Sequence, residues 1–180
     1  NQPYGDIHLL LRPLAYKKHP YQWPTIGKEV SHIENATMDE VKSFFYKHYA
    51  PNNAILVVAG DVELDQVKYL SEKWFGSIER RKYHVRNIPT EPMQTKARIL
   101  KVERDVPVDV IYKAFHMCAR THEDFFATDL ISDILSRGHS SRLNHSLVKE
   151  QKLFTNIDAF VGGSIDNGLF YFAGKLAPNI

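Results

Sequence analysis

Residues 49–62, YAPNNAILVVAGDV, constrain the fold more than any other part of this sequence. Residues 51–53 predict a sharp turn, because proline fixes its own backbone and asparagine accepts turn conformations. Residues 54–59 are continuously apolar and rich in β-branched side chains, which predicts a strand buried on both faces of a sheet. Gly60 and Asp61 predict a second turn and the cap of a following helix. The chain is therefore expected to place helices against a sheet.

A helix is expected on each side of this stretch. Thr37 and Glu40 have the spacing of a capping box, in which each side chain accepts a hydrogen bond from the other residue's backbone N–H. Residues on one face then recur every three or four positions until Pro51 ends the helix. The next helix has the same period and should stop at Gly76. The residues on these faces are Val41, Phe44, Phe45, His48 and Tyr49 in the first helix, and Leu64, Val67, Leu70 and Trp74 in the second.

A linker and a second unit are expected to follow. Residues 79–97 are polar, contain Pro89 and Pro92, and show no periodicity. Before the first helix, the loop at 19–27 is dense in proline and aromatic residues and is expected to be fixed on a surface. The expected elements of the second unit are strands at 99–106, 108–118, 154–161 and 169–176, a helix that begins between Thr121 and Asp124, a break at 136–141, and a helix through Leu143, Leu147 and Val148.

The composition is that of an ordinary globular protein, with 43% apolar and 24% charged residues among 180. A net charge of +2 gives no support for a nucleic-acid partner or a membrane partner, and no apolar run approaches the ~18 residues of a membrane helix. The basic run at 80–86 is interpreted as a solvated linker, with a binding patch as the alternative. The single Cys118 excludes an internal disulfide and, from its apolar neighbours, predicts a buried thiol in a strand.

None of the nine histidines has the spacing of a helical zinc site. Such a site needs two histidines one turn apart with a carboxylate beside them. His122-Glu123 begins the motif His-Glu-x-x-His, but Phe126 stands where the second histidine belongs. No metal site is therefore predicted in this chain.

The first open candidate is a loop between two expected helices, which either contacts or gates a peptide or simply connects the helices. No Gly-x-Ser-x-Gly elbow is present, so the two serines are better explained by helix capping than as nucleophiles. The residues of this loop are Gly138, His139, Ser140, Ser141 and Arg142.

The second open candidate is the hairpin at 162–168, which begins with Gly162 and Gly163. It either offers a sheet edge to an extended peptide or is a plain turn. Gly60-Asp61 also has the position of a strand-to-helix phosphate loop, but it lacks the glycine pattern and the Walker lysine. Gly60 is therefore expected to serve the turn of the backbone.

Short segments that are weak alone form a specific ordered series over nearly the whole chain. In the first half they are PYG at 3–5, AY at 15–16, HPY at 19–21, PTIG at 24–27, ATMDEV at 36–41, FF at 44–45, YAPNNA at 49–54 and VVAGDV at 57–62. In the second half they are LISDIL at 130–135, Gly138, SSRL at 140–143, LVKE at 147–150, the strand at 154–161 and GLF at 168–170. This series resembles the insulinase/pitrilysin-type zinc metallopeptidases, which include the mitochondrial processing peptidases and their bacterial relatives.

The resemblance implies an α+β fold of mainly antiparallel sheets with packed helices, as in the LuxS/MPP-like metallohydrolases. In that family, each half-molecule is built from two units of similar design. Residues 1–78 would be the C-terminal part of a first unit, residues 79–97 a linker, and residues 98–180 most of a second, non-catalytic unit. The chain is thus expected to be a fragment of a longer protein.

The resemblance also implies a zinc-dependent endopeptidase activity for that longer protein. In the family, two histidines of a His-x-x-Glu-His helix and a downstream glutamate hold the zinc, and the glutamate of the motif activates water. The motif is absent from this sequence, so the chain alone is expected to be inactive and to contribute scaffold and a wall of the peptide chamber. The expected partners are a peptide or protein substrate, the N-terminal catalytic part, and a second half-molecule or subunit.

Two other hypotheses are open. In the first, the longer protein is a non-catalytic binding or assembly subunit, like the respiratory-complex core proteins of the same fold. The absence of His-x-x-Glu-His from that longer protein would support this hypothesis. Alternatively, the chain is an independent catalytic domain that uses His122 and Glu123, which predicts stoichiometric zinc.

The family also handles substrate with a glycine-rich loop at the position of 136–141, where this chain has Gly138 as its only glycine. The sequence assigns no compartment; a bacterial protein of this family would be periplasmic or cytoplasmic.

Overall fold

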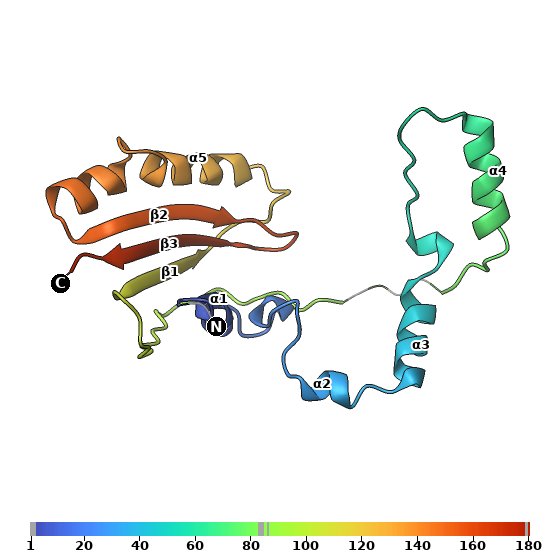
Figure 1. The fold of residues 1–180 in the computed structure, drawn as a ribbon, viewed down its shortest axis with the longest axis horizontal. Coiled ribbons are helices and arrows are strands. Elements are labelled where there is room, and N and C mark those ends of the chain that lie inside the picture. Colours follow the sequence, from blue (N-terminus) through green and yellow to red (C-terminus); the bar gives the residue numbers. More distant parts are fainter. Residues whose placement is uncertain (1–2, 83–84, 86, 179) are drawn as a thin grey trace. The chain divides into compact units, whose positions relative to one another are not determined.

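A computed structural model describes residues 3–82, 85, 87–178 and 180 of the chain. The chain divides into two compact units, of which unit 1 comprises Asn1–Thr25 with Pro89–Ile180, and unit 2 comprises Ile26–Ile88. Unit 1 contains a sheet with its helices, and the described part of unit 2 contains helices joined by loops (Figure 1). The first 25 residues therefore group with the C-terminal part of the chain.

The centre of unit 1 is a three-stranded antiparallel sheet with the order β1–β3–β2. Its strands are β1 (Val110–His116), β2 (Phe154–Gly162) and β3 (Leu169–Leu176). β2 and β3 form the expected hairpin, which ends with Gly162 opposite Leu169. Neighbouring side chains of a strand point to opposite faces, so Leu169 and Phe170 belong to two different apolar clusters. The predicted α+β fold with an antiparallel sheet is confirmed.

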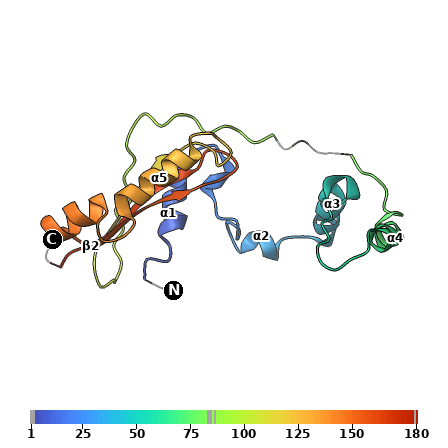
Figure 2. The same ribbon diagram turned by 90° about the horizontal axis from the view of Figure 1, so that it is seen from above.

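Helices cover both faces of this sheet (Figures 1 and 2). On one face, α1 (Ile7–Ala15) and the 3₁₀ helix η1 (Pro20–Gln22) lie over a cluster that contains Ala15, Tyr16 and Leu169. On the other face, α5 (Phe125–Ser136) and the π-helix η3 (Asn144–Glu150) lie along β2. Burial of apolar side chains on both faces is what stabilises this unit.

Two helices of unit 2 lie close to the expected places, but the unit buries little. Its helices are α2 (Ser31–Glu34), α3 (Met38–His48), the 3₁₀ helix η2 (Pro51–Asn53) and α4 (Leu64–Phe75). The capping box is confirmed, because Thr37 N–H donates to Glu40 Oε2 at 2.8 Å and Glu40 N–H donates to Thr37 Oγ1 at 3.3 Å. Ala50 is the single buried side chain among the residues of unit 2 that the structure describes.

The strand predicted at residues 54–59 is wrong for this structure. These residues form no ladder with any described part of the chain, and Ile55 is 92% exposed and Val57 79% exposed. A strand needs a neighbour that pairs its backbone groups and a layer that covers its side chains. The described part of unit 2 provides neither, although the apolar pattern itself is that of a buried strand.

The strand predicted at residues 99–106 fails in the same way, since it pairs with none of the described residues and Ile99 is 82% exposed. The helix cap predicted at Asp61 is also wrong, because α4 begins three residues later without a side-chain cap. Gly60 does turn the backbone, with a φ of +146°. Cys118 follows the end of β1 and is half-buried, so it is not a strand residue as predicted.

The two units do not follow the predicted boundaries at residues 78 and 97. The described residues up to Thr25 group with the sheet in unit 1, and the returning chain joins unit 1 at Pro89 rather than after residue 97. These units describe contacts within this chain. The assignment of 1–78 and 98–180 to two family units, with a linker at 79–97, stays a prediction.

Candidate functional site

Among the described residues, no group of three or more His, Cys, Asp or Glu side chains lies close enough together to hold a metal ion. His122 makes a local turn contact, in which its Nδ1 accepts the Asp124 N–H at 3.2 Å. Phe126, at the position of the missing ligand, is 78% exposed. The geometry around His122 and Glu123 therefore gives no support to an independent zinc site.

The candidate loop at residues 138–142 connects α5 to η3 and is fixed by its own backbone. Gly138 has a φ of +82°, and its carbonyl accepts the Ser141 N–H at 3.2 Å, which closes a turn. Lys149 Nζ donates to the His139 carbonyl at 2.7 Å and ties this turn to η3. Ser140 and Arg142 are exposed. This geometry fits a helix connection, and a role in peptide contact stays a prediction.

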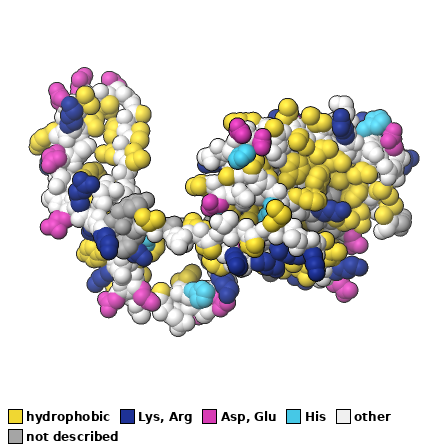
Figure 3. All heavy atoms as spheres, turned by 180° about the vertical axis from the view of Figure 1, so that it is seen from behind, with side chains coloured by type: hydrophobic (Ala, Val, Ile, Leu, Met, Phe, Trp, Pro, Cys, Tyr) yellow, Lys and Arg dark blue, Asp and Glu magenta, His cyan; other side chains and the backbone are white. Residues whose placement is uncertain are grey.

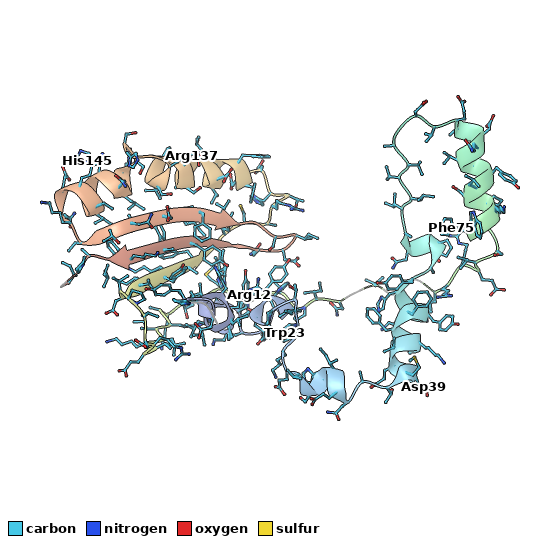
Figure 4. The ribbon with its side chains drawn as sticks, in the orientation of Figure 1. Arg12, Trp23, Asp39, Phe75, Arg137 and His145 are labelled. Carbon is cyan, nitrogen blue, oxygen red and sulfur yellow. The ribbon has the colours of Figure 1, made fainter. Side chains whose placement is uncertain are left out.

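The segment around this loop holds several unusual features. Ser141 is buried, and neither its Oγ nor Asn144 Oδ1 has a hydrogen-bond partner among the described residues. The following segment is a π-helix, which is rare and recurs at functional sites. Lys152 then adopts a left-handed backbone with a φ of +53°. Arg137 and His145 extend outward on either side of the loop (Figure 4).

The hairpin glycines lie where the sheet is covered. Gly162 is paired with Leu169 at the end of β2. A Cβ on Gly163 would lie 2.6 Å from the ring of Phe125, so a larger residue there would require this ring to move. Arg120 N–H donates to the Ser164 carbonyl at 2.8 Å. The strand order leaves the outer edge of β2 without a strand neighbour in the described sheet, and the addition of a peptide there stays a prediction.

The tip of this hairpin is bonded to the aromatic loop that follows α1. Tyr16 Oη donates to the Asn167 carbonyl at 3.0 Å, and Asp166 N–H donates to Tyr21 Oη at 3.3 Å. The His19 ring is 4% exposed, with Nε2 3.2 Å from Asp166 Oδ2. Because His19 Nδ1 accepts the Tyr21 N–H at 3.1 Å, a neutral ring donates from Nε2 to the carboxylate. Burial raises the pKa of the Tyr16 hydroxyl far above its usual value, so it remains a donor.

Glu91 lies at the centre of the same contact region. Its carboxylate accepts three consecutive backbone N–H groups, from Lys17 and Lys18 at 2.8 Å and from His19 at 2.9 Å. Partial burial acts to raise the pKa of Glu91, but the three donors hold it below its ordinary value. The sequence pattern predicts a linker at Glu91, because no local feature shows that its partners lie 72 to 74 positions away.

Arg81, in the basic run at 80–86, has a clear structural role. Arg81 Nη1 donates to the carbonyls of Tyr46 at 3.0 Å and Tyr49 at 3.1 Å, and its guanidinium lies 4.6 Å from the centre of the Tyr46 ring. Arg81 thereby satisfies carbonyls at the end of α3. Tyr83, His84 and Arg86 lie outside the described residues.

None of the helices in the described ranges combines the length and the apolar character that a membrane span requires.

Comparisons with known proteins agree with this architecture. Residues 35–179 match the family described as "Peptidase M16 inactive domain". The chain is 33% identical to the zinc protease PqqE of Helicobacter pylori, over 100% of this chain and 41% of that protein. It is 23% identical to an uncharacterised zinc protease of Streptomyces coelicolor, over 92% of this chain and 37% of that protein. The chain thus spans about two fifths of the length of these relatives.

Solved structures show the same fold. The crystal structure of a protease from Helicobacter pylori has a TM-score of 0.77 at 33% identity, over 99% of this chain and 44% of that one. A peptidase M16 inactive domain from Pseudomonas fluorescens has a TM-score of 0.76 at 22% identity, over 96% of this chain and 41% of that one. The family match covers most of the sequence, and the chain therefore belongs to the peptidase M16 inactive-domain family.

Proposed function

We propose that this chain is a non-catalytic part of a longer zinc-dependent metalloendopeptidase, in which it contributes scaffold and a wall of the peptide chamber. The observation that carries this proposal is the 33% identity to a protein named as a zinc protease, over 100% of this chain but 41% of that relative. More than half of the relative's length therefore lies outside the match. The zinc site is proposed to belong to that part of the longer protein.

The exposed apolar faces of unit 2 support a scaffold role. Residues 54–59 are apolar and exposed, as are Phe44 on α3 at 59% and Trp74 on α4 at 66%. Apolar surface of this extent is typical of an interface. We infer that other parts of the longer protein cover these faces and that residues 54–59 join a sheet there.

The described residues of this chain do not fit a zinc site, because their histidine and carboxylate side chains form no cluster of three. The proposal accordingly assigns zinc binding and water activation to residues outside this sequence. It also includes a peptide or protein as the substrate and a second half-molecule or subunit as the partner. The role of this chain is to bind and position these parts.

The proposal is tested by the comparison of this chain with the longer protein encoded by the same reading frame. Zinc content is measured by metal analysis, and cleavage is measured with a fluorogenic peptide. The longer protein should bind stoichiometric zinc and cleave the peptide, whereas this chain should do neither. Stoichiometric zinc with cleavage by this chain alone would contradict the proposal and favour an independent catalytic domain.

A second candidate is a binding or assembly subunit of the same fold. A chain of the complex III2 structure from Candida albicans has a TM-score of 0.66 at 16% identity, over 94% of this chain and 41% of that one, which shows a shared fold only. The same experiment separates the two candidates. A longer protein that lacks His-x-x-Glu-His and zinc, but assembles with a partner, would favour the second.

A further inference from the structure

The chain leaves unit 1 after Thr25 and returns to it at Pro89. The segment of unit 1 that ends at Thr25 and the segment that begins at Pro89 meet at one place, and the tip of the β2–β3 hairpin lies there as well. We propose that Glu91, His19 and Asp166 form a clasp, which holds the outgoing segment, the returning segment and the hairpin tip together as one cooperative element. This inference concerns unit 1 alone and does not depend on the proposed function.

The first joint of the clasp holds the returning segment against the outgoing one. Glu91 accepts the N–H groups of residues 17–19 at 2.8 to 2.9 Å. Arg98, seven positions further on, donates to the carbonyls of Leu14 at 2.6 Å and Ala15 at 3.1 Å. The Glu91 carboxylate thus accepts hydrogen bonds from backbone N–H groups just after α1, and the Arg98 guanidinium donates to backbone carbonyls at the end of α1. Charge-assisted bonds of this kind are roughly twice as strong as neutral ones.

The second joint holds the outgoing segment against the hairpin tip. His19 Nε2 lies 3.2 Å from Asp166 Oδ2, and the Asp166 N–H reaches Tyr21 Oη at 3.3 Å. Tyr16 adds its bond to the Asn167 carbonyl at 3.0 Å. The backbone N–H and the carboxylate of Asp166 are therefore both bonded to residues that lie 145 and 147 positions earlier in the chain.

His19 belongs to both joints, and this makes them cooperative. Its backbone N–H is held by Glu91, while its ring contacts Asp166 and accepts the Tyr21 N–H. The ring is 4% exposed, so it has little room to move without the backbone. Loss of the Glu91 contact is therefore expected to loosen the hairpin tip, and loss of the tip contact is expected to loosen residues 17–19, since coupling between sites is reciprocal.

Amide hydrogen exchange, measured by NMR on the full 180-residue chain, tests this coupling. In Glu91→Gln, the exchange rates of the Lys17, Lys18 and His19 amides should rise at least about tenfold, because a charge-assisted acceptor is lost. The Asp166 amide should also exchange several-fold faster, while the amides of β1 keep their rates. Glu123→Gln is the matched control, because Glu123 is exposed and is not one of the residues of the clasp, and it should change none of these rates.

A second variant approaches the clasp from the other end. Tyr21→Phe removes the acceptor of the Asp166 N–H but keeps the ring, so the Asp166 amide and, through His19, the amides of residues 17–19 should exchange faster. If Glu91→Gln changes only residues 17–19 and Tyr21→Phe changes only Asp166, the two joints are independent and the clasp is refuted. An equal rise at the β1 amides in both variants would show a general loss of stability and would refute it as well.

Discussion

Units 1 and 2 carry similar apolar patterns but differ in what they bury. In unit 1, Leu169 is 2% exposed between strands and helices, whereas in unit 2 Ile55 is 92% exposed within a run that has the pattern of a buried strand. Hydrophobic side chains, yellow in Figure 3, lie at the surface of both units. Both patterns predict residues that are buried away from water. The difference teaches that an apolar pattern shows which residues need a covering layer, while the presence of that layer depends on distant parts of the protein.

The same lesson holds within unit 1 on α5. Its inward side includes Phe125 and Leu135, which pack against the apolar cluster of that face, together with Thr128 and Ser132, whose hydroxyls donate to the carbonyls of Asp124 and Asp129. Its outward side includes Phe126 at 78%, Leu130 at 60% and Ile134 at 47% exposure. α5 thus has apolar side chains on both of its sides, and those on the outward side are exposed. The exposure of this side of α5 extends to unit 1 the proposal made for unit 2, that other parts of a longer protein cover the exposed apolar faces.

The largest effect is expected from one apolar truncation in each unit. Leu169→Ala should lower the free energy of unfolding by about 2–5 kcal/mol, because it leaves a cavity between β3 and α1. Ile55→Ala should change it by less than about 0.5 kcal/mol, because the side chain is exposed. Urea denaturation of both variants measures the contrast. A comparable loss in Ile55→Ala would show that residues 54–59 are buried in this chain in solution.

A smaller effect is expected from the removal of one hydroxyl in unit 1. Tyr16→Phe should cost about 1–2 kcal/mol, because the Asn167 carbonyl loses a donor in a partly buried place. Because burial raises the pKa of Tyr16 above its ordinary value of 10.0, its contribution is complete below pH 10 and is lost as the pH rises further. Denaturation between pH 9 and pH 11 should therefore show a steeper decline in the wild type than in Tyr16→Phe. Equal slopes would contradict this account.

The capping box of unit 2 tests local structure that does not depend on burial. Thr37→Ala should destabilise α3 by about 1 kcal/mol, as is typical for the loss of an N-cap hydroxyl. Circular dichroism should show reduced helicity, while the amide exchange of β1–β3 in unit 1 stays unchanged. Thr37→Ser is the matched control, since it keeps the hydroxyl. A change of exchange in the sheet would show that the effect is not confined to α3 and would contradict this prediction.

The smallest effect is expected from acid titration of Glu91. Three N–H donors hold its pKa below the ordinary value of 4.5, so its contribution is complete above that pH and is lost as the pH falls below it. The effect is reduced because the carboxylate is in part exposed to water. The wild type should lose more stability than Glu91→Gln between pH 5 and pH 3. An identical pH dependence in both proteins would show that Glu91 is not held as described.

The sequence predicted best those features that depend on residues close together in the chain. The Thr37–Glu40 box, the turn at Pro51–Asn53, α5 and the β2–β3 hairpin were all predicted, because each is formed by the chemistry of one short continuous stretch of the chain. The ordered series of segments also predicted the family, which the match over residues 35–179 confirms.

The features that could not be predicted depend on distant partners. Glu91 lies in a proline-containing polar stretch, and only the fold brings it to residues 17–19. The strands predicted at 54–59 and 99–106 have the correct pattern but lack a paired edge among the described residues. The π-helix at Asn144–Glu150 was predicted as an ordinary helix, because its apolar residues do not reveal the extra residue in each turn.

The central claim is that this chain is a non-catalytic part of a longer M16 protein, other parts of which cover its exposed apolar faces. Amide hydrogen exchange at residues 55–59 tests it most directly, measured in this chain and in the longer protein. The account predicts rapid exchange in the chain alone and strong protection in the longer protein, where these residues would join a sheet. Strong protection in the chain alone, or rapid exchange in both proteins, would contradict it.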